Sequence, residues 1–266
     1  MTALYAWLNR RGRGFSGWLN PWLNALRFAC TAFVALLSPS TYNKAMRLVV
    51  QKQIYFTAWQ ILPGFALFAA LFSFLIIEIV VTTARKYGLY EYALELIVRI
   101  LVLEIQPLMT ALFIGLRTGA AINTEVALMK IQNELYALQR MGVDPVRLEL
   151  LPRVVGGTLS VMVVTAVTTA IAIWLTHLLI VDFHPWNLTS GDFTRIMGKV
   201  LDWPALLVLW VKALAFGLAV TVIPISEGLS TPQQLYKAPI SVLRGMVRLF
   251  FTLMLIEGIA LVVVYV

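Results

Sequence analysis

The stretch that decides the fold runs from Glu104 to Arg153 and reads EIQPLMTALFIGLRTGAAINTEVALMKIQNELYALQRMGVDPVRLELLPR. An apolar run ends at Gly115–Arg117, an amphipathic segment follows, and a second apolar run begins after Pro152 and Arg153. A connector this regular between two apolar runs of membrane-spanning length indicates a docking element rather than a loose loop.

The composition places most of this chain in lipid. The 266 residues are 60% hydrophobic and only 13% charged, with a mean hydropathy of +0.84. A soluble domain has about a quarter charged residues and less than half apolar ones, so this chain lacks the charges to cover a water-facing surface. The basic residues behind the net charge of +8 lie between apolar runs, which is typical of a membrane protein facing an anionic leaflet and not of a nucleic-acid-binding protein.

Five apolar stretches have the ~20-residue length that a bilayer-spanning helix needs. They cover residues 58–83, 96–116, 154–181, 204–225 and 246–266. Backbone polar groups inside a bilayer must be satisfied within their own segment, so these stretches are expected to be helices. The predicted fold class is an all-α integral membrane protein.

The basic residues predict how the chain is oriented. Of the 21 lysines and arginines, fifteen lie in the N-terminal region and in the second and fourth connectors, five lie on the alternate side, and Lys212 lies inside a span. By the positive-inside rule, the N-terminus is expected in the cytoplasm and the C-terminus on the far side of the membrane.

The N-terminal residues 1–55 are expected to form an element separate from a membrane domain over residues 56–266. Trp18 and Trp22 alternate with arginines, and residues 22–37 are apolar but too short to span comfortably. This composition favours a helix that lies in the membrane interface. A disordered basic tail is the alternative, although such tails are poor in aromatic residues.

Residues 124–141 predict a short amphipathic helix in the second connector. Its apolar residues recur at three- and four-residue spacing and so share one face, namely Leu128, Ile131, Leu135 and Leu138. Asn123 or Thr124 can cap its start, Gly142 suits the C-terminal cap, and Pro145 prevents continuation. The alternative is an ordinary interfacial helix that has no partner.

Four ionisable residues lie in the predicted spans: Glu78, Glu104, Lys212 and Glu257. Each costs several kcal/mol at the bilayer centre unless it faces protein or water. Glu104 is followed by Pro107, which removes a backbone donor and frees local carbonyls, so a polar cavity is expected there. Lys212 can pair with one of the carboxylates or extend to an interface. A structural ion pair, or a position near the lipid headgroups, is the alternative for each.

The sequence contains no convincing catalytic, nucleotide-binding or metal-binding motif. The sequence has no Walker A motif and no GxSxG, and the GxGxxG match at Gly12–Gly17 lacks the strand and βαβ unit that give it meaning. His177 and His184 have neither a cysteine partner nor an HExxH context. The sequence therefore predicts no metal, no cofactor and no enzymatic activity in this chain.

A series of motifs runs in order through the opening stretch. They are Glu104 with Pro107, Gly115 to Ala121, Glu125 with Met129, Ala137 with Leu138, Met141 to Pro145, and Pro152 with Arg153. In order and spacing, over about fifty residues, they resemble the MlaE-type permeases. These are the membrane subunits of ABC systems that move lipids between bacterial membranes together with MCE-domain proteins.

Three departures from the family pattern mark a divergent member. Leu103 stands where the family usually has an arginine, and residues 124–127 lack the family's glycine. The connector between the fourth and fifth spans, residues 228–236, has lost most of the glycines that are usual there.

The resemblance implies an interfacial N-terminal helix, five spans, a homodimer, and a short cytosolic coupling helix between spans two and three that docks on an ATPase. It implies docking roles for Glu125, Met129, Leu135, Leu138, Met141, Gly142, Asp144, Pro145 and Arg153. Candidates for the wall of a lipid cavity between two protomers are Glu104, Pro107 and Glu78. A heterodimer with a paralogue is the alternative assembly.

The partners implied are a cytosolic ABC ATPase that holds the ATP, an MCE-domain protein, a small accessory regulatory subunit, a second copy of the chain, and phospholipid. The implied location is the bacterial inner membrane, with a cytoplasmic N-terminus and a periplasmic C-terminus.

The expected function is that of a permease subunit that moves phospholipid or a related amphiphile between membranes. One alternative is a stand-alone secondary transporter or channel that uses Glu78, Glu104 or Lys212 as ion-coupling groups, although five spans without inverted repeats disfavour it. A membrane scaffold without a transport role is the other.

Overall fold

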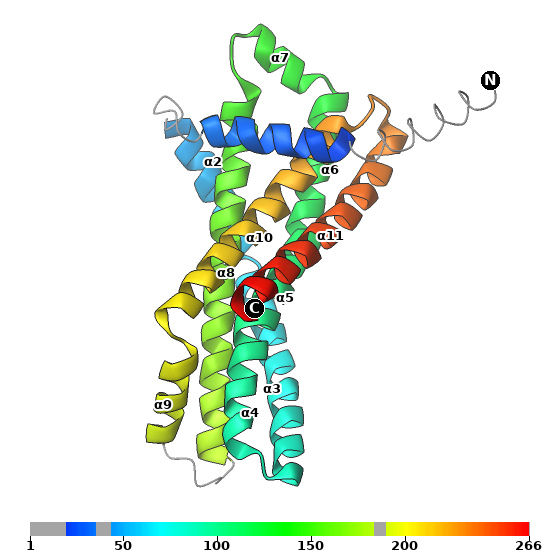
Figure 1. Ribbon diagram of the computed structural model, residues 1–266. Helices are drawn as coiled ribbons and strands as arrows, with labels where there is room; N and C mark the ends of the chain where they lie inside the picture. Colours follow the sequence, from blue (N-terminus) through cyan, green and yellow to red (C-terminus); the bar gives the residue numbers. More distant parts are fainter. Residues whose placement is uncertain (1–19, 36–43, 184–189, 266) are drawn as a thin grey trace, which may run out of the picture.

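The computed structural model describes residues 20–35, 44–183 and 190–265, and within these ranges the chain forms helices and short connections without a strand (Figure 1). The Gly12–Gly17 match, Trp18 and His184 lie outside the described residues.

Five helical stretches in these ranges are long and apolar enough to cross a membrane. They are Met46–Tyr87, Tyr92–Ile131, Val146–Val181, Trp203–Ser230 and Leu235–Val264. Each overlaps one of the five predicted spans, so the predicted all-α architecture with five spans is confirmed.

Most spans are built from several helical segments in succession. The first contains α2 (Lys44–Ile54), the π-helical η2 (Tyr55–Trp59) and α3 (Leu62–Tyr87). The second contains α4 (Tyr90–Leu96), the π-helical η3 (Ile97–Ile105), α5 (Gln106–Ile114), the π-helical η4 (Gly115–Gly119) and α6 (Ala120–Ile131), and α7 (Glu134–Arg140) follows it. The third contains the π-helical η5 (Val146–Leu150), α8 (Leu151–His177) and the π-helical η6 (Leu178–Phe183). Then come α9 (Ser190–Val200), the fourth span α10 (Trp203–Ser230), and the fifth span with the 3₁₀ turn η7 (Leu235–Lys237) and α11 (Ala238–Tyr265).

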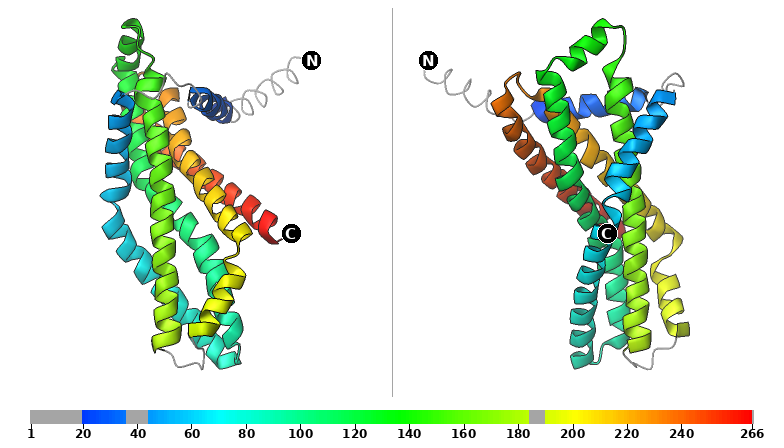
Figure 2. Two further views of the ribbon diagram at one scale, coloured as in Figure 1. Left: turned by 90° about the vertical axis from the view of Figure 1, so that its left-hand side faces the viewer. Right: turned by 180° about the vertical axis from the view of Figure 1, so that it is seen from behind.

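The spans form an elongated bundle with two distinct ends (Figure 1). One end carries α7 and is called the α7 end below, and the other carries α9 and the start of α4. A helix over residues 20–35 lies across the bundle at the α7 end (Figure 2). Phe28 of this helix is buried in one cluster with Val126 and Ile225, and Ala32 is buried in another with Leu151. Its position in the membrane interface, and the division of the chain at residue 55, stay predictions.

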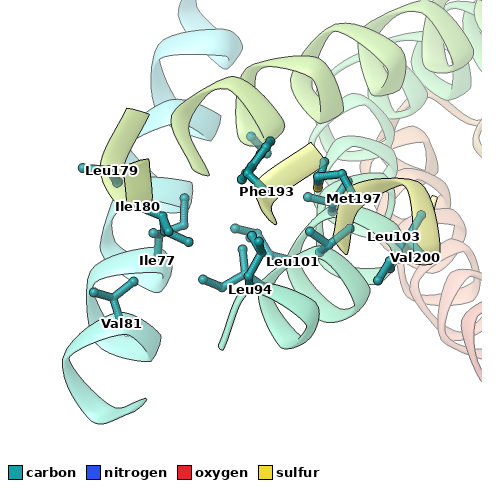
Figure 3. Packing of buried hydrophobic residues seen from close by; sticks show 14 of the residues in the cluster. Ile77, Val81, Leu94, Leu101, Leu103, Leu179, Ile180, Phe193, Met197 and Val200 are labelled. Carbon is teal, nitrogen blue, oxygen red and sulfur yellow. The ribbon is translucent and has the colours of Figure 1, made fainter. Parts of the chain in front are cut away.

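The α9 end is held together by aliphatic and aromatic packing between α9 and the neighbouring spans (Figure 3). Ile77 of α3, Leu94 of α4 and Ile180 of η6 are fully buried in one cluster with Phe193 and Met197 of α9. This contact fixes the short helix α9 against three spans.

Small residues allow close approach between helices at the α7 side of the bundle. A Cβ added at Gly119 would lie 3.2 Å from the Pro224 side chain, and one added at Gly115 would lie 2.7 Å from Leu249 Cδ2. These glycines therefore pack against the fourth and fifth spans of the same chain, in keeping with the role of small residues in helix packing within lipid.

The predicted helix over residues 124–141 is wrong as a single element. Helix α6 continues the second span to Ile131, the chain turns at Asn133, which has φ +60°, and α7 covers only Glu134–Arg140. Asn123 and Thr124 do not cap a helix start; both lie inside α6, where Asn123 is completely buried. The reason is tertiary, because the start of α6 packs on α10 and the two helices stay together to the end of the second span.

The predicted end of the connector helix is confirmed. Gly142 follows α7 with φ +76°, which is a left-handed conformation that glycine adopts readily. Its N–H donates to the carbonyl of Gln139, and the N–H of Val143 donates to that of Leu138. Pro145 then precedes the next helical segment, η5.

Gly217 on α10 supplies a test of this packing. A Cβ at Gly217 would lie 2.9 Å from Thr158 Cα and 3.0 Å from its carbonyl oxygen, so backbone must move to admit it. We expect Gly217→Ala to destabilise the fold by about 1–3 kcal/mol, measured as a lower midpoint of thermal unfolding in detergent. Gly258→Ala is the control, since nothing lies within 4 Å of a Cβ there. Equal midpoints for the two variants would contradict the close α8–α10 contact.

Candidate functional site

A buried charged triad joins the second, fourth and fifth spans. Lys212 Nζ of α10 forms an ion pair with Glu104 of η3 and lies 3.2 Å from Glu257 Oε1 of α11. The exposed fractions are 3% for Lys212, 9% for Glu104 and 8% for Glu257. The predicted pairing of Lys212 with a carboxylate is thus confirmed, and the lysine contacts two carboxylates instead of one.

The triad holds its charges away from lipid. A buried ammonium or carboxylate is costly unless it is paired and hydrogen-bonded. One ammonium between two carboxylates leaves a formal excess of one negative charge, which a proton or a cationic group could neutralise. The arrangement therefore fixes three spans in register.

The surroundings of Glu104 differ from the polar cavity expected beside Pro107. Pro107 is buried in the first turn of α5, directly after the π-helical η3. Glu104 borders a hollow of about 510 Å³ whose apolar lining includes Leu96 and Ile100 of the second span and Leu261 of α11. Glu95 and Arg99, which form an ion pair with each other, also line it. The third cavity candidate, Glu78, lies half-buried on α3, and no ion pair joins it to another described residue.

A second polar network, which was not predicted from the sequence, lies nearer the α7 end. Glu227 of α10 pairs with Arg248 of α11. Ser241 Oγ lies 3.2 Å from Asn123 Oδ1, and Thr231 Oγ1 donates to Ser241 Oγ at 2.6 Å. A charged residue in each of two neighbouring apolar helices was the available signal, because opposite charges within spans are expected to pair.

Three of the residues predicted for ATPase docking lie together within this chain. Arg153, at the start of α8, donates to Glu125 Oε2 of α6 at 2.8 Å and to Glu149 Oε2 at 3.3 Å. The Met129 sulfur lies 3.9 Å from the same guanidinium. Arg153 therefore ties the end of the second span to the start of the third, and little of its side chain faces outward.

The other residues predicted for docking lie on or just after α7. Leu135 and Leu138 are half-buried, Met141, Gly142 and Asp144 are exposed, and Pro145 is buried. Asp144 Oδ1 accepts the N–H of Val146 at 2.9 Å, so this carboxylate caps the following helical segment.

The connector between the fourth and fifth spans supports the base of α7. Gln233 Nε2 donates to Asn133 Oδ1 at 2.8 Å, and Lys130 Nζ donates to the carbonyl of Leu229. This connector, residues 228–236, thus contacts the turn between α6 and α7.

The fifth span leaves a wide apolar surface open. Only 17% of its most apolar stretch is buried, against 56% for the fourth span. A hollow of about 1060 Å³ lies on this surface. Its apolar lining includes Trp22 of the N-terminal helix and, on α11, Leu243, Val247, Phe251 and Leu255, and Arg244 and Arg248 also border it. This surface needs lipid or protein to cover it.

The described residues contain no group of three or more histidine, cysteine, aspartate or glutamate side chains placed to hold a metal ion. The site is therefore defined by paired charges inside the spans, an apolar hollow on α11 and a helical projection at the α7 end.

Together these features define a multi-span helical membrane protein of the transport-permease class. The chain belongs to the MlaE permease family, since the family model described as "Permease MlaE" matches residues 50–263. The match includes residues of all five spans.

Curated relatives agree with this assignment. The chain is 35% identical over 146 residues to the intermembrane phospholipid transport system permease protein MlaE of Haemophilus influenzae. That match covers 51% of this chain and 55% of the relative, so the chain spans about half the length of that protein. A probable ABC transporter permease protein of Rickettsia typhi is 23% identical over 205 residues, 76% of each chain. A probable ABC transporter permease protein of Synechocystis is 27% identical over 129 residues, 48% of each chain.

Lys212 provides a test of the triad. Lys212→Met leaves Glu104 and Glu257 buried without a cation, and we expect a loss of about 3–5 kcal/mol in the free energy of unfolding. The measurement is thermal or denaturant unfolding of the detergent-solubilised protein. The triple variant Lys212→Met, Glu104→Gln, Glu257→Gln removes all three charges and should recover most of that loss. Glu78→Gln serves as the control for a half-buried carboxylate outside the triad. A Lys212→Met protein as stable as the original would show that the pairing contributes nothing.

Proposed function

We propose that this chain is the permease subunit of an ABC transporter that moves phospholipid or a related amphiphile between the membranes of a bacterium. The observation that carries the proposal is the open apolar surface of α11, with its hollow of about 1060 Å³, in a chain of the MlaE permease family. Acyl chains need no hydrogen bonds, so an apolar hollow of this kind suits them. The names of the Haemophilus and Rickettsia relatives support the same class of activity.

In this proposal the α7 end faces the cytoplasm of a cell whose inner membrane holds the protein. The predicted excess of basic residues on the side of the second and fourth connectors supports that orientation. The N-terminus is then cytoplasmic and the C-terminus periplasmic. ATP is bound and hydrolysed by a separate cytosolic ATPase, and this chain contributes no cofactor and no catalytic residue.

The ATPase docks on α7 and the segment that follows it. The most exposed apolar side chains there are Tyr136 and Met141, with Val143 beside them. Glu125, Met129 and Arg153 act behind this surface, since their mutual contacts connect α6 to α8. A movement of α7 would then pass into the second and third spans together.

The cargo surface is completed by a second copy of the chain, facing the first across α11. An MCE-domain protein receives or delivers the lipid on the periplasmic side, and a small accessory subunit regulates the ATPase. Glu104 fits the proposed cavity wall, because the hollow that it borders also contains Leu261 of α11. Glu78 and Pro107 line neither this hollow nor the one on α11.

The triad favours one other function enough to test. Two carboxylates that share Lys212 could couple ion movement to transport in a stand-alone secondary transporter. Lipid movement that requires ATP and a partner ATPase supports the permease. Movement that follows an ion gradient in the absence of ATP supports the secondary transporter.

The docking proposal predicts the behaviour of Met141→Asp. Met141 is 67% exposed, so an aspartate there leaves the fold intact but places a charge in the apolar centre of the contact. We expect at least about tenfold less ATPase in affinity purifications from native membranes in mild detergent, quantified by mass spectrometry.

Leu89→Asp is the matched control, since Leu89 is also exposed and lies between α3 and α4 at the other end of the bundle. It should purify with the ATPase as the unchanged protein does. Full retention of the ATPase by Met141→Asp would place the docking surface elsewhere. Purification of the unchanged chain without an ATPase, even after crosslinking, would overturn the permease proposal.

A further inference from the structure

A second pocket, separate from the triad and from the α11 hollow, opens at the α7 end. It has a volume of about 530 Å³ and lies between α2 and η2 of the first span, the η4–α6 part of the second, and the start of the third. It shares no lining residue with the hollows beside Glu104 or on α11. Its wall is closely packed, because a Cβ at Gly156 would lie 2.8 Å from Gln53 Cβ and 3.2 Å from the Val50 carbonyl. The close contact between α2 and α8 therefore lies directly beside Gln53, which lines the pocket.

The charges in this pocket favour an anion. Its basic residues are Lys52, Arg117 and Arg153, and its acidic residues are Glu125 and Glu149. Arg153 pairs with both carboxylates. Within the described part of the chain, no ion pair engages Lys52 or Arg117. An ammonium and a guanidinium thus line the same pocket without a carboxylate of their own.

The pocket lies where the apolar stretches of the first and second spans end. Arg117 directly follows the apolar run of the second span, and Phe56 lines the pocket from the first span. Tyr55 and Trp59 are exposed on the same turn of helix as Phe56. Exposed tyrosine and tryptophan side chains are enriched at the headgroup level of membranes. The position suits a group that belongs to a lipid.

An aromatic row leads from this level into the apolar part of the bundle. Phe113, one helical turn before Arg117, stacks on Phe65 with ring centroids 4.4 Å apart. Phe65 stacks on Phe68, and Phe68 on Phe72, each at 6.1 Å. Phe68 and Phe113 keep exposed surface. The exposed rings of Phe68 and Phe113 offer acyl chains a surface that begins one helical turn from Arg117.

We propose that this pocket binds the phosphate of an anionic phospholipid between Lys52 and Arg117, with the acyl chains of the lipid along the aromatic row. Arginine and lysine both bind phosphate oxygens through charge-assisted hydrogen bonds. Gln60 and Thr118 also line the pocket and can hydrogen-bond the polar headgroup beyond the phosphate. The assignment of this lipid to the cytoplasmic leaflet rests on the orientation proposed above, whereas binding itself does not.

The test removes the two cations. The full-length protein in detergent is titrated with phosphatidylglycerol, and native mass spectrometry counts the tightly bound lipids per chain. We expect Lys52→Gln with Arg117→Gln to weaken the binding of one phosphatidylglycerol at least about tenfold. The control is Arg47→Gln with Arg140→Gln, which removes the same net charge from exposed positions at the same end and outside the pocket. This control should leave binding unchanged.

Two further ligands distinguish whether the pocket binds a lipid or a soluble anion. Diacylglycerol, which has no phosphate, should bind the unchanged protein and the double variant equally. Inorganic phosphate at millimolar concentration should not displace the phosphatidylglycerol. Displacement by phosphate would overturn the assignment to a lipid, and equal loss in the double variant and its control would overturn the assignment to this pocket.

Gln60→Glu is the second variant, in case the double variant does not accumulate. It retains both cations and adds a negative charge to the pocket, so it should also weaken phosphatidylglycerol binding. Unchanged binding in either pocket variant overturns the proposal. Because the titration uses the chain without an ATPase, a failure of the docking or transport proposal leaves this result unaffected.

Discussion

The rest of this structure depends on the pairing of Lys212 with Glu104 and Glu257. An ammonium inside an apolar bundle is tolerated only where it meets carboxylates, and these carboxylates lie on the second and fifth spans. The fourth span must therefore lie between them and cannot slide by a helical turn without exposing a charge. Dispersion contacts between apolar helices in lipid are similar in many registers. A charged triad, in contrast, is satisfied in only one register of the three helices. This constraint explains how a chain with few polar side chains acquires a defined arrangement.

The second network extends this order toward the α7 end. Glu227 with Arg248 fixes the fourth span against the fifth, and Asn123 with Ser241 fixes the second against the fifth. Because α6 continues the second span without a helix start of its own, α7 is attached to this network through a rigid helix and a single turn. A force on α7 would act on buried hydrogen bonds and ion pairs, which have discrete arrangements, and not on a flexible loop. That property suits a helix that transmits the state of a partner.

Structural features that depend on neighbouring residues could be predicted from the sequence. Features that depend on packing between distant segments could not. Span number follows from hydropathy, and the end at Gly142 follows from glycine's access to positive φ, so both could be predicted. The start of the connector helix could not, because Asn123 resembles a cap in sequence and becomes a buried hydrogen-bond partner only when the fifth span lies beside it. The docking role of Arg153 stays a prediction, whereas its contact with Glu125 was not predicted, because only the fold brings the two residues together.

The open face of α11 differs in character from the helix contacts within the chain. The side of α11 that faces the bundle carries Gly245, where a Cβ would lie 2.5 Å from Asn123 Nδ2, so α11 and α6 approach closely there. Its outer side carries Leu243, Phe251 and Leu255 around a wide hollow. Tight helix association in lipid relies on small residues, because apolar side chains gain little by leaving lipid for one another. A large, bulky and hollowed surface is therefore poorly suited to close contact with another helix along its length. It is better suited to acyl chains, which can fill an irregular apolar space, and this favours a cavity over a sealed interface on the fifth span.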